Sequence, residues 1–249
     1  MLRSIKEIKG SHIHARDGRI GGVEALYFDD ESWEVRYFVV GAGNLFAHQK
    51  VLLVPDLLRE EAGADSSFVL RSSLTREQIR NAPGIETAPP VSDRREAAYL
   101  EAAPYWMASG EVAGPMWAPA DARTFSATNQ ASSGARDPHL RSTREVRGYR
   151  VRSLDGEIGH VENFIVDGEG WAIRYVAVDT RNWLPGKKVL VASSWVSDVS
   201  WADAELSVDL RSIEVKEAPT WDPNTPISRE YETRLHSYYG RTPYWVFAR

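Results

Sequence analysis

The sequence contains no cysteine. That absence excludes disulfides, thiolate zinc sites and cysteine nucleophiles, and it fits a reducing compartment. Long apolar runs are also absent, because the longest, such as residues 37–40, have the length of a strand and not of a membrane span. The first residues show no apolar leader segment. We therefore expect a cytoplasmic protein with no membrane span, and attachment to a membrane through a partner stays open.

A strong charge of either sign is missing too. The net charge is −5, and acidic and basic residues are mixed along the whole chain. No basic stretch stands out, which argues against direct, sequence-independent binding of nucleic acid. Aromatic residues are plentiful by comparison, and the nine tryptophans supply heavy core material.

The most informative feature of the chain is an internal duplication. Residues 2–58 align without a gap with residues 140–196, and about a third of the aligned positions are identical. We predict two repeats, over residues 1–106 and 140–249. Residues 107–139 have no counterpart, are rich in Ala, Ser, Gly and Pro, and are predicted to be a linker.

Each repeat has the periodicity of short strands. An Asp-Gly pair, at residues 17–18 and again at 155–156, lies between alternating runs and is a strong hairpin signal. Gly21 and its counterpart Gly159 indicate a bulge or a barrel corner. Five or six antiparallel strands are expected per repeat, including residues 20–29, 33–40, 50–54, 68–71, 171–178, 188–192 and 206–211. Because such a sheet must close or cover its edges, the predicted fold is mainly β, with two small antiparallel β-barrels in tandem.

A short helical tail is predicted after each barrel. Ser73 or Thr75 caps a first helix start, and later helices are expected at residues 92–102 and 228–239. Both tails end in Pro-Tyr-Trp, at residues 104–106 and 243–245. We expect each aromatic end to pack on its own barrel, with packing on the other barrel or on a partner as the alternative.

Several short motifs repeat in both copies and carry a family resemblance. They are the leading Leu-Arg-Ser, Ile-Gly-x-Val-Glu at residues 20–24 and 158–162, and Arg-Tyr-x-x-Val at residues 36–40 and 174–178, with residues 179–191 and the tail. The chain resembles the PRC-barrel family, and most closely its tandem bacterial members of unassigned function.

The resemblance implies a small β-barrel that serves as a protein-contact and assembly module, with no shared catalytic residues. The family's barrel also occurs in the photosynthetic reaction-centre H subunit and in a ribosome maturation factor. The sequence shows neither the membrane helix of the first nor the RNA-associated domain of the second, so neither role is implied here.

Possible catalytic or metal-binding residues do not survive comparison of the two copies. His12 and His14 share a strand face, but their counterparts are Arg150 and Arg152, and no third ligand is apparent. We predict no metal site, no cofactor and no catalytic residue; an enzyme remains the less favoured alternative. A structural ion pair is expected between Glu24 and Arg36, and likewise between residues 162 and 174.

The loop before the fourth strand is the predicted partner-contact surface. It combines apolar and basic residues in the second repeat and is mostly apolar in the first; the candidates are Leu45, Phe46, Trp183, Leu184, Lys187 and Lys188. We therefore predict a non-catalytic protein-binding or assembly module whose two barrels pack together. The alternatives are a small-ligand sensor and a peripheral component of a membrane or RNA-processing complex.

Overall fold

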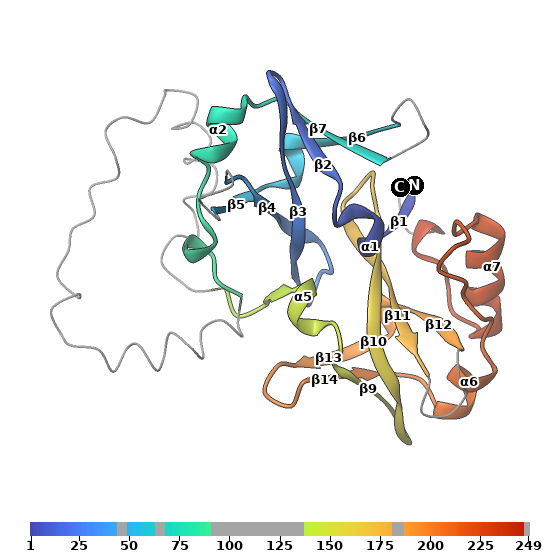
Figure 1. Ribbon diagram of the computed structural model, residues 1–249. Helices are drawn as coiled ribbons and strands as arrows, with labels where there is room; N and C mark the ends of the chain where they lie inside the picture. Colours follow the sequence, from blue (N-terminus) through green and yellow to red (C-terminus); the bar gives the residue numbers. More distant parts are fainter. Residues whose placement is uncertain (44–48, 63–67, 91–136, 181–186, 247–249) are drawn as a thin grey trace, which may run out of the picture.

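The protein is mainly β. A computed structural model describes residues 1–43, 49–62, 68–90, 137–180 and 187–246, and Figure 1 shows its two sheets side by side. None of the helices in these ranges is long and apolar enough to cross a membrane.

The elements of the two repeats follow the same order. Those of the first repeat are β1 (Leu2–Ser4), α1 (Ile5–Ile8), β2 (His12–Ala15), β3 (Gly18–Asp29), β4 (Val35–Gly41), β5 (Lys50–Leu53), η1 (Pro55–Leu57), β6 (Leu58–Ala62), β7 (Phe68–Ser72), α2 (Arg76–Arg80) and η2 (Ile85–Thr87). Those of the second are β8 (Leu140–Ser142), α5 (Thr143–Val146), β9 (Arg150–Ser153), β10 (Gly156–Asp167), β11 (Ala172–Asp179), β12 (Lys188–Ala192), η5 (Ser193–Trp195), β13 (Val196–Ser200), β14 (Glu205–Val208), α6 (Ser212–Glu217), α7 (Arg229–Tyr238) and η6 (Tyr244–Val246).

Each sheet has seven strands and is mixed. The order in the first is β5-β4-β3-β2-β7-β6, and in the second β12-β11-β10-β9-β14-β13, with one more strand paired onto β3 or β10. The prediction of wholly antiparallel sheets is wrong, because β2 pairs with β7 and β9 with β14 in parallel. The chain continues in one sense from β5 through η1 into β6 and reverses only before β7, so β7 runs in the same direction as β2.

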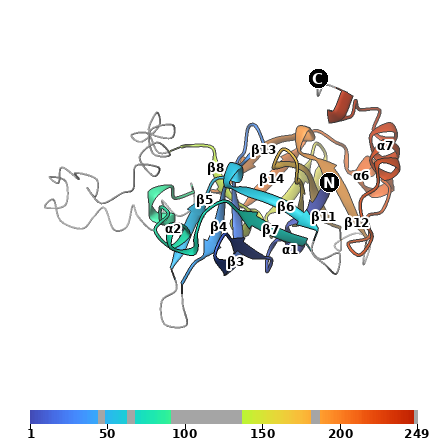
Figure 2. The ribbon, with the colours of Figure 1, turned by 90° about the horizontal axis from the view of Figure 1, so that it is seen from above.

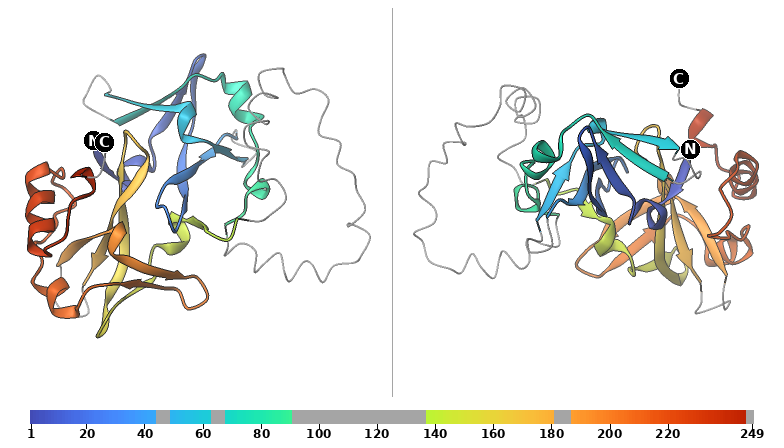
Figure 3. Two further views of the ribbon diagram at one scale, coloured as in Figure 1. Left: turned by 180° about the vertical axis from the view of Figure 1, so that it is seen from behind. Right: turned by 45° about the horizontal axis from the view of Figure 1, so that its top comes forward.

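The seventh strand of each sheet comes from the other repeat. β1 pairs with β10, so that Leu2 lies opposite Asp167, and β8 pairs with β3, so that Leu140 lies opposite Asp29. Figures 1 and 3 show β1 lying beside β10. The repeats therefore exchange strands reciprocally, in the same register.

The two repeats also share one hydrophobic core. Its buried side chains come from both sheets, and the Phe28 and Phe164 rings meet with centroids 5.7 Å apart. Burying this apolar surface between the sheets is the main favourable term that holds the repeats together.

Two glycines bend the longest strands, as predicted. Gly21 is the extra residue of a bulge between β2 and β3, and a Cβ on it would lie 1.5 Å from the Gly41 carbonyl oxygen. Gly159 makes the same approach to the Asp179 carbonyl oxygen at 2.1 Å. Both have positive φ, so glycine is required by conformation and by space.

The helical predictions are confirmed where the structure describes them. Thr75 caps α2 in a full capping box, and α7 falls within the predicted range 228–239. The predicted helix at 92–102 lies outside the described residues. Figure 2 places α2 and α7 at opposite ends of the molecule. The second tail packs on the sheet of its own repeat, because Tyr175 of β11 bonds to Glu232 and His236 of α7.

Candidate functional site

The two lysines of the predicted contact loop are tied to the protein itself. The Lys188 ammonium pairs with the Glu162 carboxylate, as Lys50 pairs with Glu24 at 2.8 Å in the first repeat. Lys187 donates to the Lys216 carbonyl, where Gln49 donates to that of Arg80. These lysines therefore have a structural role beside any contact they make. The other candidates, Leu45, Phe46, Trp183 and Leu184, lie outside the described residues.

The predicted pairing of Glu24 with Arg36 is wrong. Arg36 instead pairs with Asp29 at 2.9 Å, and Arg174 pairs with Asp167 at 3.3 Å. The register shifts between Val23 and Ala25, so Glu24 sits in a bulge, and its carboxylate pairs with Lys50 of β5. Burial raises the pKa of Asp29, but hydrogen bonds from Ser32 and Arg36 outweigh it and leave that pKa below its usual value.

The remaining predicted polar residues also lie in structural positions. His12 Nδ1 is 3.1 Å from the Gly21 carbonyl oxygen, and the part of the chain that the structure describes holds no cluster of three or more metal-ligating side chains. Asp17 accepts the Arg76 amide at 2.7 Å, so a hairpin turn caps α2. Asp155 does the same for Ser212 of α6 at 2.6 Å.

A buried polar cluster joins α7 to β11. The Tyr175 hydroxyl donates to Glu232 Oε1 at 2.9 Å and lies 3.1 Å from Nε2 of His236, and the Tyr244 hydroxyl donates to the same Oε1 at 3.0 Å. Tyr175 is fully buried, and Glu232 and His236 are each 2% exposed. Burial raises the pKa of Glu232 and lowers that of His236. The side chains of Tyr175, Glu232 and His236 are therefore closed off from solvent, with Tyr244 at the edge of the cluster.

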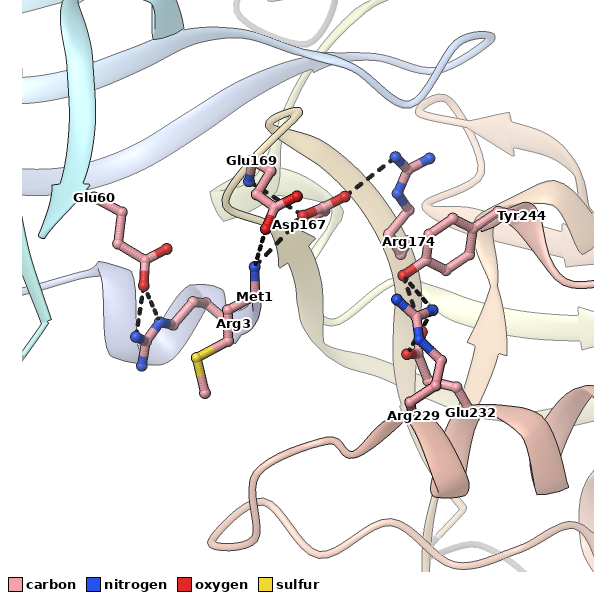
Figure 4. Close-up of polar contacts among 9 residues, drawn as sticks. All are labelled: Met1, Arg3, Glu60, Asp167, Glu169, Arg174, Arg229, Glu232 and Tyr244. Carbon is pink, nitrogen blue, oxygen red and sulfur yellow. Dashed lines mark hydrogen bonds and ion pairs between the residues drawn. The ribbon is translucent and has the colours of Figure 1, made fainter. Parts of the chain in front are cut away.

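Two arginines enclose the aromatic end of the tail. The Arg174 guanidinium lies 4.3 Å from the ring centroid of Tyr244, and Arg229 lies 4.1 Å from that of Trp245. Arg229 also pairs with the Glu232 carboxylate at 3.1 Å. Figure 4 shows Arg174 and Arg229 approaching Tyr244 from two elements. Cation–π contacts of this kind explain how the Pro-Tyr-Trp end is held.

Ion pairs join the exchanged strand β1 to both repeats. Arg3 pairs with Glu60 of β6 at 2.6 Å, and the amino group of Met1 lies 3.8 Å from both Asp167 and Glu169. Figure 4 shows that the Met1 and Arg174 pairs meet at Asp167, with the Arg3–Glu60 pair to one side. They stabilise the crossing of the strands.

Among the described residues, a hollow of about 620 Å³ opens on the first repeat. Polar and apolar side chains line it: Gln49, Lys50, Arg80, Asn81, Ala82, Gly84, Ile85 and Glu86. At the position of Ile85 the second repeat has Trp221, which is 5% exposed. Tyr231 of α7 closes over that place by donating to the Pro219 carbonyl at 3.2 Å.

No protein-family model matches this chain. No curated protein matches its sequence either. The comparison that the molecule itself offers is between its two repeats: in the described part of the chain, the tail covers the second repeat where the first has the hollow.

Sequence reasoning missed both the buried cluster and the hollow. Glu232 and His236 are four residues apart, a spacing that places both on one face of α7. That spacing was a usable signal, since charged residues on the inner face of a helix need partners. The hollow had no such signal. Ile85 and its counterpart Trp221 are both apolar, and they differ in side-chain volume, which a hydropathy pattern does not show.

Proposed function

We propose that this chain is a non-catalytic binding module built from two repeats of the PRC-barrel type. The observation that carries the proposal is the difference between equivalent surfaces of the repeats. Among the described residues, the place that Trp221 and α7 cover in the second repeat is a hollow around Lys50, Arg80 and Ile85 in the first. This difference supports binding by the first repeat and a stabilising role for the second.

The lining of the hollow favours a protein partner. Arg80 is exposed, with no ion pair among the described residues, and it can pair with an acidic side chain. Ala82 and Ile85 are half-buried and offer apolar contact beside it. A partner segment with adjacent acidic and apolar residues fits this surface.

Capture from lysate of the native host, with quantitative mass spectrometry, tests the proposal on the full chain. Arg80→Glu should lose proteins that the unchanged chain retains. Lys216→Glu is the matched control, because Lys216 is the counterpart of Arg80 in the closed repeat. Thermal melting of all three proteins separates loss of binding from loss of fold. Equal retention by the three would contradict the proposal.

A small-ligand sensor is the second candidate. The volume of about 620 Å³ lies within the range of roughly 300–1,000 Å³ that small-molecule sites occupy. A thermal-shift screen of metabolites against the full chain tests it. Shifts that vanish in an Ile85→Trp variant, which copies the closed repeat, would support the sensor.

The barrel belongs to the same proposal. The two edge strands of each sheet are consecutive in the chain: β5 continues through η1 into β6, and β12 through η5 into β13. The edges of each sheet therefore meet at a covalent corner, which is the arrangement of a small barrel. Nuclear Overhauser contacts between β5 and β6 would test closure.

A further inference from the structure

His139 lies where the exchanged strand β8 enters the first repeat. Its Nδ1 is 2.9 Å from an Asp30 carboxylate oxygen, and its Nε2 is 3.5 Å from one of Glu31. Its carbonyl accepts the Asp30 amide at 3.0 Å. The next residue, Leu140, begins β8 opposite Asp29. One side chain thus connects the start of the exchanged strand to the turn between β3 and β4.

The geometry around the ring suits an imidazolium. Both ring nitrogens face a carboxylate oxygen, but a neutral imidazole has one N–H and must present a lone pair to the other carboxylate. Only the protonated ring donates at both positions. The contacts therefore favour the charged form on geometric grounds alone.

The surrounding charges favour the same form. Acidic side chains near the ring come from the turn and from its own segment: Asp29, Asp30, Glu31 and Asp137. The nearby cations, Arg36 and Arg141, are already paired with Asp29 and Asp30. The hydrogen bond to Asp30 is the main cause that raises the pKa of His139 above 6.5; burial opposes it, and Glu31 adds to it.

The equivalent joint in the second repeat uses a different cation. The Gly168 amide donates to the Met1 carbonyl at 3.0 Å, and the amino group of Met1 faces Asp167 and Glu169. At both exchanged strands, a positively charged group therefore faces an acidic turn. It is the amino group of Met1 before β1 and the imidazole of His139 before β8.

We propose that His139 is a pH-sensitive clasp on the exchanged strand β8, closed by the imidazolium and loosened when the ring loses its proton. A raised folded-state pKa stabilises the joint fully below the unfolded value of 6.5. That contribution is lost as the pH rises through the folded value. This window begins at the ordinary histidine value of 6.5, within reach of physiological changes of pH. The binding proposal above does not depend on this clasp.

Hydrogen exchange on the full-length chain tests the clasp. The Asp30 amide and the amides of β8 are followed at about pH 5.5 and pH 8.5, after correction for intrinsic exchange, in the unchanged protein and in His139→Gln. We expect protection in the unchanged protein to fall relative to the variant as the pH rises, by about tenfold for each unit by which the pKa is raised. His160→Gln, at a half-buried position on β10, is the control and should follow the unchanged protein.

A proton titration of the six histidines by NMR gives the second readout. The signal that His139→Gln removes should titrate above 6.5. Glu31→Gln should lower that titration and leave the fold intact, since Glu31 is mostly exposed. A titration at or below 6.5, or protection ratios between the unchanged chain and His139→Gln that do not change with pH, would overturn the clasp.

Discussion

The backbone amide of Ile173 donates to the carbonyl of Trp33 over 2.7 Å, and this bond joins the two repeats. Its counterpart runs the other way, from the Val35 amide to the Trp171 carbonyl at 2.8 Å. Both tryptophans have a left-handed backbone, with φ of 61° and 48°. The pair of bonds follows a pseudo-two-fold axis, as in an isologous dimer interface. The repeats therefore meet as two equivalent halves.

Removing one ring from the shared core should destabilise both repeats at once. Phe28→Ala takes away a fully buried side chain that contacts Phe164, and we expect a loss of about 3–5 kcal/mol in the free energy of unfolding. Denaturant unfolding followed by circular dichroism and by tryptophan fluorescence should show one shifted transition. Leu154→Ala, at an exposed turn, should change little. Two transitions, with only one moved, would show that the repeats unfold independently.

The hydrogen-bond acceptor that one sheet uses for a buried amide should be replaceable by the acceptor that the other sheet uses. The Leu26 amide donates to the Thr143 hydroxyl at 3.1 Å, whereas the equivalent amide of Phe164 donates to the Asn163 side chain at 2.9 Å. Thr143→Val leaves a buried amide unpaired and should cost about 1–3 kcal/mol.

The equivalent place on the second sheet suggests the rescue. There, Ile5 takes the position that Thr143 has on the first sheet, and Asn163 takes that of Ala25. Thr143→Ile combined with Ala25→Asn should recover much of the stability lost in Thr143→Ile alone. Thermal melting of the single and double variants measures this coupling. Additive losses would refute the exchange of one donor arrangement for the other.

Two glycines with positive φ should respond differently to alanine. At Gly148, φ is 94° and a Cβ would meet nothing within 4 Å, so Gly148→Ala should cost only the strain of about 1–2 kcal/mol. At Gly21 the new Cβ would lie 1.5 Å from the Gly41 carbonyl oxygen. Gly21→Ala should therefore cost clearly more, since the bulge must move. Equal melting temperatures of the two variants would contradict this reading of the bulge.

His236 should make the protein less stable in acid. Burial lowers the pKa of His236 below 6.5, and the Arg241 backbone opposes this only in part. A depressed pKa gives stability that is present above the unfolded value and is lost as the pH falls below it. From about pH 7.5 to pH 5, the unchanged protein should lose stability relative to His236→Gln.

Glu232 contributes with the opposite sign, because burial raises its pKa. The unchanged protein should therefore gain stability relative to Glu232→Gln as the pH falls through the raised folded pKa toward the ordinary value of 4.5. Thermal melts of both variants at each pH separate the two contributions. Two difference curves of the same sign would be incompatible with the buried cluster.

Local signals predicted what depends on local geometry. The Asp-Gly turns, the bulge at Gly21, the Thr75 cap and α7 are all present, because turn chemistry, positive φ and capping act within a few residues. The ion pairs were mispredicted, since one bulge moves Glu24 from Arg36 to Lys50. The parallel pairing of β2 with β7 follows from their becoming neighbours in the sheet, a long-range contact that local sequence signals do not carry.

The sequence by itself determined that the chain holds two copies of one β-rich unit. It could not determine which sheet each leading strand joins, because Leu2-Arg3-Ser4 and Leu140-Arg141-Ser142 are identical and fit both sheets in one register. Only the tertiary structure shows that each leading strand joins the sheet of the other repeat. Crossing the strands brings Phe28 against Phe164 and the β8 joint against Asp30, and so merges two small cores into one. A larger shared core buries a greater fraction of its surface than two separate ones.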